Sequence, residues 1–263
     1  MNLFLFSQTP AHTGPAVLTA PVLARMTTPP DTARTILINQ TWTQLVNAGL
    51  AAKLDLLYLT AAHDAQAATL NWAQAQYDLV PVNSPTFTTD RGVAGNGTSS
   101  YYETGFNGSN TNPARQYQRD AACQLVYVNT SVISTSQIDF GQGRSWVCCG
   151  YSTTAFRYSP NASGSFSATA AGNNGVGMYG WLKDSITTAS YVRNTSVTAA
   201  AISTTNTFNV NWLLAAAMGN GSVPGNYSTR RISFAACGAY LAPPEYLTLH
   251  AIIMDYLNAV GAA

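Results

Sequence analysis

The sequence predicts a mainly β protein, an antiparallel two-layer sandwich with an extended N-terminal arm, a helical lead-in and a closing C-terminal helix. From Asn83 onward, short segments rich in β-forming residues alternate with connectors rich in glycine, asparagine and serine. Helix-like periodicity is missing between these segments, and parallel strands would need long crossovers. We therefore expect an arm at 1–30, a small helical region at 31–82 and the sandwich with its helix at 83–263.

The first 30 residues are expected to form an extended arm. Pro10, Pro15, Pro21 and the Pro29-Pro30 pair favour an extended path, and the segment is apolar without a core of its own. It carries no basic stretch before its short apolar run, and its first charged residue is Arg25. We interpret it as a docking arm and not as an export signal, with its own domain or a neighbouring subunit as the docking surface.

The region 31–82 is expected to be largely helical. Apolar residues recur at helical spacing over 31–52, where Asp31 or Thr32 can cap the helix. The segment 54–60 is short and apolar, so it is expected to form either a buried strand or a helical turn. The segment 63–72 is predicted to be a helix.

The sandwich is expected to start with a hairpin. Strands at 85–90 and 99–106 would be folded together by Gly95-Asn96-Gly97, whose residues tolerate positive φ. Tyr101 and Tyr102 must point to opposite faces of their strand, so at most one lies in the core.

Further strands are expected down to the closing helix. In RRISFAA, alternation would place Ile232, Phe234 and Ala236 on one face. The final segment APPEYLTLHAIIMDYLNAVGAA is predicted to be a helix, with a stripe of apolar residues that packs outside the sandwich or in a subunit contact. The remaining expected strands are 122–130, 136–140, 145–151, 155–158, 164–168, 175–183, 189–193, 207–217 and 230–237.

Three stretches carry a resemblance to a known family. The runs GNGTSSYYETGFN, YGWLKDS with YVRN, and STRRISFAACGAYL before the closing helix resemble the concanavalin A-like (laminin-G-like) jelly roll of tailed-bacteriophage virion proteins. The resemblance covers roughly residues 54–263. It implies a jelly-roll fold and a virion role. It implies no catalytic residue, because the family shares no catalytic motif that maps onto this chain.

The composition points to contact with neutral surfaces. Charged residues make up 9% of the chain, against about 25% in a typical soluble domain. A net charge of +1 gives no electrostatic footprint for nucleic acid or an anionic membrane, and no apolar run approaches the roughly 20 residues of a spanning helix. A surface of hydroxyl and amide groups has little self-repulsion, so we expect a homo-oligomer.

The motifs of common catalytic and metal sites are missing from the sequence. Cys123, Cys148, Cys149 and Cys237 fit no zinc spacing, and buried thiols are the preferred interpretation over disulfides. The sequence contains no Gly-x-Ser-x-Gly elbow, no phosphate-binding glycine loop and no calcium-binding loop. Calcium bound by ligands from separate parts of the chain is kept as an alternative. We expect no metal and no cofactor. His12, His63 and His250 form no apparent site.

Glycoside hydrolysis requires two facing carboxylates. The sequence has no Glu-x-Asp or Asp-x-Glu pair, and Asp139 and Asp184 are isolated. We therefore predict that the chain is not an enzyme. A dyad assembled from distant positions keeps a polysaccharide-degrading depolymerase on the same fold as the alternative.

Glycan binding is the expected chemistry, because aromatic faces and neutral hydrogen-bonding groups both abound. Tyrosine and tryptophan offer an apolar plane with a polar tip. The competing interpretation is that these rings form the core of the sandwich. The candidates on or beside glycine-rich connectors are Trp146, Tyr151, Tyr158, Tyr179 and Trp181, with Tyr191 near them.

The family resemblance implies a structural component of a tailed-bacteriophage virion, of fibre, spike, collar or decoration type. Its lectin-like sandwich would attach to bacterial surface polysaccharide, and its arm would hold other virion proteins. We expect the protein in the virion, assembled in the host cytoplasm. Deletion of residues 1–30 should abolish incorporation into particles while the sandwich stays folded.

Overall fold

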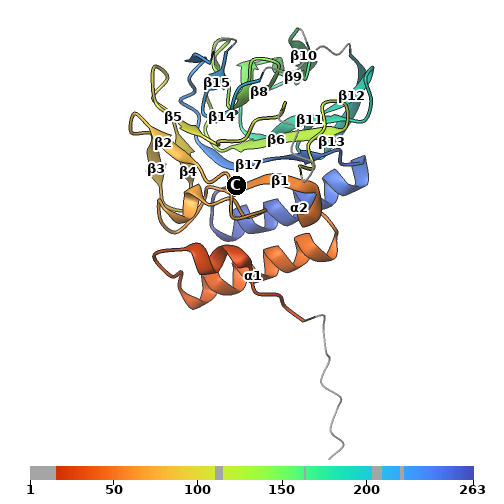
Figure 1. Ribbon diagram of the computed structural model, residues 1–263. Helices are drawn as coiled ribbons and strands as arrows, with labels where there is room; N and C mark the ends of the chain where they lie inside the picture. The colour runs from red at the N-terminus through yellow and green to blue at the C-terminus, as the bar shows by residue number, and fades with distance from the viewer. Residues whose placement is uncertain (1–15, 110–114, 163, 203–208, 220–221) are drawn as a thin grey trace, which may run out of the picture.

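Two antiparallel sheets face each other, and two helices cover the outer face of one of them (Figure 1). The computed structural model describes residues 16–109, 115–162, 164–202, 209–219 and 222–263. The predicted mainly β antiparallel sandwich with a helix near the N-terminus and another at the C-terminus is confirmed.

The first sheet, called sheet A here, lies against the helices. Its strands follow the order β13-β12-β11-β6-β17-β4-β3, and β1 also pairs with β17. β1 comes from the segment expected to be a helical region, so the sheet draws on that segment as well as on the later chain. The strands are β1 (Leu54–Leu59), β3 (Thr86–Thr88), β4 (Gly92–Ala94), β6 (Ala122–Val128), β11 (Gly177–Lys183), β12 (Thr188–Arg193), β13 (Ser196–Ala201) and β17 (Ile232–Ala239).

The second sheet, sheet B, follows the order β10-β9-β8-β7-β14-β5-β2. β15 is connected to this sheet by one parallel bridge to β7, and it also pairs with β16. Its strands are β2 (Val80–Val82), β5 (Tyr101–Glu103), β7 (Phe140–Gln142), β8 (Ser145–Ser152), β9 (Ala155–Pro160), β10 (Phe166–Thr169), β14 (Leu213–Leu214), β15 (Ala217–Met218) and β16 (Pro224–Gly225).

The core between the sheets is built around aromatic rings. Trp212 has its ring 5.2 Å from Tyr117, 5.3 Å from Phe140 and 5.6 Å from Phe106, each in an edge-to-face arrangement. All four side chains are buried. Each such pair adds roughly 0.5–1.5 kcal/mol beyond the burial of apolar area, so this cluster is a main tie between the sheets.

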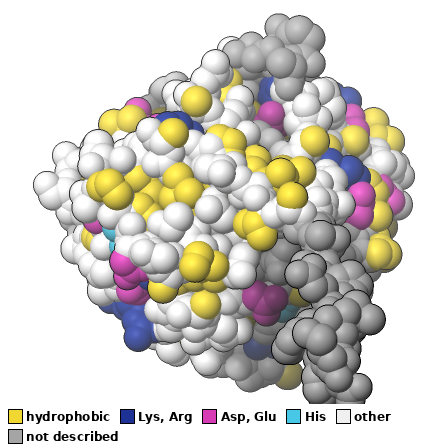
Figure 2. All heavy atoms as spheres, turned by 90° about the horizontal axis from the view of Figure 1, so that it is seen from below, with side chains coloured by type: hydrophobic (Ala, Val, Ile, Leu, Met, Phe, Trp, Pro, Cys, Tyr) yellow, Lys and Arg dark blue, Asp and Glu magenta, His cyan; other side chains and the backbone are white. Residues whose placement is uncertain are grey.

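A second core fills the space between sheet A and the helices α1 (Thr32–Asn47) and α2 (Pro243–Ala259). The stripe predicted on the terminal helix is confirmed, since Tyr246, Leu249, Ile253 and Leu257 are all buried there. The face seen from below, where α1 lies, shows few charged side chains among neutral and apolar ones (Figure 2).

Both helices begin at side-chain caps. The carboxylate of Asp31 accepts a hydrogen bond from the backbone N–H of Arg34 at 2.7 Å. At α2, Glu245 accepts from the backbone N–H of Ala242 at 2.9 Å and pairs with Lys53 at 2.5 Å. The ion pair between Glu245 and Lys53 ties the start of α2 to the residue before β1.

Residues 18–20 are hydrogen-bonded to α1. The backbone N–H groups of Leu18 and Ala20 donate to the side chains of Thr43 and Asn39, both at 2.8 Å. Val22, in the short 3-10 helix Pro21–Arg25, is buried in the core beneath sheet A. The rest of the predicted arm, residues 1–15, lies outside the described residues.

The prediction of a helix at 63–72 is wrong, and 54–59 is the buried strand β1. Within 63–72 the described helical structure is the single 3-10 turn Ala67–Thr69. Asn71 explains the difference, because its side chain accepts from the N–H of Leu57 at 2.9 Å and donates to the carbonyl of Asp55 at 2.8 Å. These bonds hold the segment along the backbone of β1.

The predicted opening hairpin is also wrong. β3 pairs with β4 across a turn at Asp90, whereas β5 lies in the other sheet, beside β2 and β14. The Gly95–Ser99 turn therefore crosses between the sheets. The side chain of Asn96 accepts from three backbone N–H groups of residues 98–100, which fixes this crossing. Tyr102 faces the core between the sheets and Tyr101 the opposite face, as alternation predicts.

The predicted common face of Ile232, Phe234 and Ala236 is interrupted. A register shift in the pairing of β17 with β6 falls between Ile232 and Phe234. Ile232 consequently points into the core between the sheets, and Phe234 and Ala236 point toward the helices.

The four cysteines are buried free thiols. Cys123 lies in the core beneath sheet A and Cys237 in the core between the sheets, so these neighbours in paired strands face opposite ways. Among the described residues, no helix has the length and apolar character to cross a membrane.

Candidate functional site

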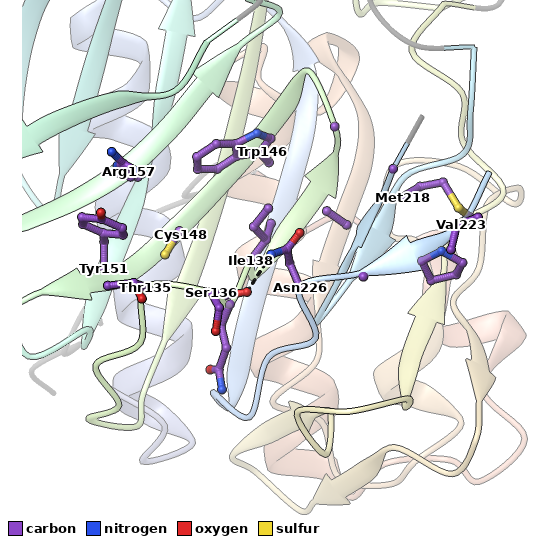
Figure 3. Close-up of a pocket in the computed structure, with 16 residues that line it drawn as sticks. Thr135, Ser136, Ile138, Trp146, Cys148, Tyr151, Arg157, Met218, Val223 and Asn226 are labelled. Atoms are coloured by element: carbon purple, nitrogen blue, oxygen red, sulfur yellow. Dashed lines mark hydrogen bonds between the residues drawn. The ribbon is translucent and has the colours of Figure 1, made fainter. Parts of the chain in front are cut away.

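The outer face of sheet B carries a hollow of about 520 Å³. It lies between the strands β7 to β9, the loop before β7 and the β15–β16 hairpin. Tyr151 and Arg157 lie toward one end of this hollow and Met218 and Val223 toward the other, with Trp146 between them (Figure 3).

Alternation along β8 and β9 builds the floor of the hollow. Val147, Cys149, Phe156 and Tyr158 point into the sandwich core. Their neighbours Trp146, Cys148 and Arg157 therefore point outward, and all three line the hollow. Cys148 and Arg157 are direct partners across the two strands.

Tyr151 and Arg157 form a stacked pair at one end. The guanidinium carbon lies 4.1 Å from the centroid of the tyrosine ring, which is a favourable cation–π distance. The Nε of Arg157 also donates to the hydroxyl of Ser167 on β10 at 3.1 Å. The guanidinium is thus held on its face and at one edge.

One wall is the loop from Thr135 to Ile138, which is pinned to Asn226. The side-chain amide of Asn226 donates to the carbonyl of Ser136 at 2.8 Å (dashed in Figure 3). The N–H of Ile138 donates to the backbone carbonyl of Asn226, also at 2.8 Å. Asn226 has a positive φ of 55°, which asparagine tolerates better than most residues.

A buried ion pair supports this wall from below. Arg230 and Asp139 are fully buried, and Nη1 of Arg230 lies 3.1 and 3.2 Å from the two carboxylate oxygens. Arg230 also donates to the carbonyls of Val132, Ser134 and Gly150 at 2.7–3.3 Å. Burial alone would lower the pKa of Arg230, but the carboxylate of Asp139 raises it, so Arg230 stays a cation.

Cys148 contributes contact surface to the hollow. Burial raises the pKa of its thiol to about 12, so the group is protonated at neutral pH. A thiol in that state is a poor nucleophile, and its place under Arg157 favours a packing role.

The structure divides the predicted glycan-binding residues. Trp146 and Tyr151 come together at the hollow, partly exposed. Tyr158, Tyr179 and Trp181 lie in the core between the sheets, at most 2% exposed, and cannot reach a surface ligand. Tyr191, partly buried, packs against the same core. The hydroxyl of Tyr179 is used internally, since it donates to Asn173 at 2.7 Å.

Sequence reasoning missed Arg157, Asn226 and the loop 135–138. Arg157 could have been found by period-two counting, since Phe156 and Tyr158 flank it and point inward. Asn226 and the loop belong to distant segments, and their meeting depends on the path of the whole sheet.

A second, more open hollow of about 760 Å³ has two carboxylate residues in its lining. Asp120 and Asp184 both line it, although the sequence had suggested that Asp184 is isolated. Burial alone would raise the pKa of Asp120, but a hydrogen bond from Arg119 and the charge of Lys183 lower it. Lys183 is fully buried, 3.4 Å from that carboxylate.

Within the described ranges, no three His, Cys, Asp or Glu side chains cluster in a way that could hold a metal ion.

Comparison with known proteins identifies the fold. No family model matches the chain, and no curated protein matches it. Among solved structures, it is similar to a Trypanosoma rangeli sialidase, with 12% identity and a TM-score of 0.52, over 86% of this chain and 40% of that one. A mutant of HCR/D is similar at 8% identity and a TM-score of 0.51, over 80% of this chain and 53% of that one.

A third structure, domain 4 of the GH43 extracellular arabinanase AbnA from Geobacillus stearothermophilus, has 12% identity and a TM-score of 0.49. The match covers 75% of this chain and 98% of that domain. At such identities the likeness shows the fold alone, and this chain spans about two fifths of the length of the sialidases that it matches.

The expectation that the chain is not an enzyme is contradicted by these comparisons. The sandwich is shared with a sialidase, which is a glycosidase, so neither the fold nor the lack of a local acidic motif argues against glycosidase activity. The β-sandwich part of the resemblance noted from the sequence is confirmed, and the virion part stays a prediction.

Proposed function

We propose that the protein recognises carbohydrate through the hollow on the outer face of sheet B. The observation that carries the proposal is the placement of Trp146 and Tyr151 in one recess with neutral hydrogen-bonding groups, among them Ser136, Gln137 and Asn226. Aromatic planes stack on the apolar faces of sugar rings, and hydroxyl and amide groups bind their hydroxyls.

The test is binding of immobilised bacterial polysaccharides by the full chain and by Trp146→Ala. Loss of the indole should weaken binding about tenfold or more, about 1.4 kcal/mol, as for a central aromatic anchor. Trp42→Ala is the matched control, since that side chain packs against the core beneath sheet A, away from the hollow. Equal binding by wild type and W146A would refute the assignment of the site.

Hydrolysis of polysaccharide is the second candidate function, and the second hollow favours it. Asp120 and Asp184 line that hollow together, and a pair of carboxylates is the usual equipment of a glycosidase. With its lowered pKa, Asp120 is suited to act as the base or nucleophile, and Asp184 is the second carboxylate that such a reaction requires.

The experiment for hydrolysis is size-exclusion chromatography of polysaccharides incubated with wild type, Asp120→Asn and Asp184→Asn. Shortened chains with wild type and intact chains with both variants would support this function. Intact chains in all three incubations would refute it.

The biological setting that we propose is attachment of a tailed bacteriophage to its host, with the protein in the virion as a homo-oligomer. The motif resemblance and the charge-poor surface support this setting. Because Leu18 and Ala20 are hydrogen-bonded to α1 and Arg25 to Asn71, the sharper test of an N-terminal anchor to other virion proteins deletes residues 1–15 alone. Unchanged incorporation of that truncation into particles would refute the anchor.

A further inference from the structure

Arg157 gives the proposed carbohydrate site its charge. It is the one charged residue among those that line the hollow in the described part of the chain. Asp139 lies below the wall, but it is fully buried and neutralised by Arg230. Among the described residues that line the hollow, Arg157 is therefore a single cation without a carboxylate to oppose it.

The guanidinium is oriented for a ligand. Its face lies on the ring of Tyr151, and its Nε is used by Ser167. Within the described residues, its two Nη groups make neither an ion pair nor a hydrogen bond with the protein. Stacking and the Ser167 contact fix the plane, so little side-chain entropy is lost when an anion binds.

We propose that the ligand of this site is an acidic glycan, whose sugar carboxylate is bound by the Nη groups of Arg157 while a neighbouring ring packs on Trp146. This inference rests on the proposed function and names its substrate class. Arginine donates two parallel hydrogen bonds to a carboxylate, and these charge-assisted bonds are stronger than those to the hydroxyl groups of a neutral sugar. A partly exposed pair of this kind also weakens with salt.

The experiment is affinity electrophoresis of the full chain in gels that contain hyaluronate, polygalacturonate, alginate or polysialic acid. Each polymer is paired with its carboxyl-reduced form, which keeps the backbone and removes the charge. We expect retardation by at least one acidic polymer, with an apparent affinity at least tenfold lower for its reduced form. Raising NaCl from 50 to 500 mM should weaken the acidic interaction and leave the reduced one unchanged.

Variants separate charge recognition from folding. Arg157→Gln should bind the acidic polymer as weakly as wild type binds the reduced form, and Arg157→Lys should recover part of the affinity. Arg231→Gln is the matched control, because it removes the same charge from a different hollow, near Ala262. Circular dichroism of each variant reports that the sandwich is intact.

The outcomes distinguish this inference from the function on which it rests. Equal binding of acidic and reduced forms, binding of neutral polymers alone, or unchanged binding by R157Q would overturn the acidic specificity and leave carbohydrate binding standing. Absence of binding to every acidic and reduced polymer would overturn both.

Discussion

Replacing Arg230 with methionine should destabilise the protein and disorder the wall of the proposed site. The substitution leaves the carboxylate of Asp139 fully buried with two donors, the N–H of Cys149 at 2.8 Å and the hydroxyl of Ser228 at 2.7 Å, but without a cation. It also removes the donors to the carbonyls of Val132, Ser134 and Gly150.

The magnitude follows from these contacts. Breaking one side of a buried ion pair costs about 3–5 kcal/mol. In a domain of this size each kcal/mol lowers the melting temperature by about 2–4 °C, so R230M should melt about 6–20 °C below wild type. Since a typical domain is stable by roughly 5–15 kcal/mol, the variant should still fold at low temperature.

The assay is thermal and urea unfolding followed by circular dichroism. Asp139→Asn combined with R230M should be less destabilised than the sum of the single changes, because the double variant has no unpaired buried charge. Arg231→Met is the control next door and should lie within about 0.5 kcal/mol of wild type. Because loss of one partner of a buried ion pair should cost about 3–5 kcal/mol, a free energy of unfolding of R230M within about 1 kcal/mol of wild type would refute the reasoning.

Three further predictions concern separate parts of the molecule. Tyr179→Phe should cost about 1 kcal/mol, since the side-chain carbonyl of Asn173 loses one of its two donors and keeps the N–H of Gly175 at 3.1 Å, and should leave polysaccharide binding unchanged; lost binding at unchanged stability would contradict the core placement. Gly141→Ala should prevent folding to soluble protein, because φ is +133° and a Cβ would lie 2.0 Å from the Ser145 carbonyl; a soluble variant of wild-type stability would contradict this. A hydrogen bond from Lys53 lowers the pKa of Glu245 in the folded protein. The ionised Glu245 therefore stabilises the fold above its ordinary pKa of 4.5, and this stabilisation is lost as the pH falls through the lower folded pKa. Glu245→Gln should flatten the acid side of the plot of melting temperature against pH, and an unchanged acid side would contradict the assignment.

The strands with clear turn chemistry were predictable, and the crossing points were not. Alternation and glycine-rich connectors located β6, β8 and β11 to within a few residues. The turn at Gly95–Ser99 has the composition of a hairpin but joins two sheets, because β5 pairs with strands far along the chain. The local sequence around β5 does not indicate that it pairs with β2 and β14.

The site was predictable in part for the same reason. Aromatic content nominated Trp146 and Tyr151 together with Tyr158, Tyr179 and Trp181, and composition alone cannot tell which face of a strand a ring occupies. Counting inward from Phe156 separates Tyr158 from Arg157, but that phase becomes known only when one residue of the strand is placed in the core.

The most direct test of the central claim is an NMR titration with an acidic oligosaccharide that the protein binds. It follows the side-chain N–H resonances of the five tryptophans as the oligosaccharide is added. The indole groups of Trp72, Trp181 and Trp212 are buried, and Trp42 packs against the helix-side core. The account predicts that the Trp146 resonance shifts with saturating dose dependence and the other four stay in place. A shift confined to other tryptophans, or a Trp146 resonance unmoved at saturation, would contradict it.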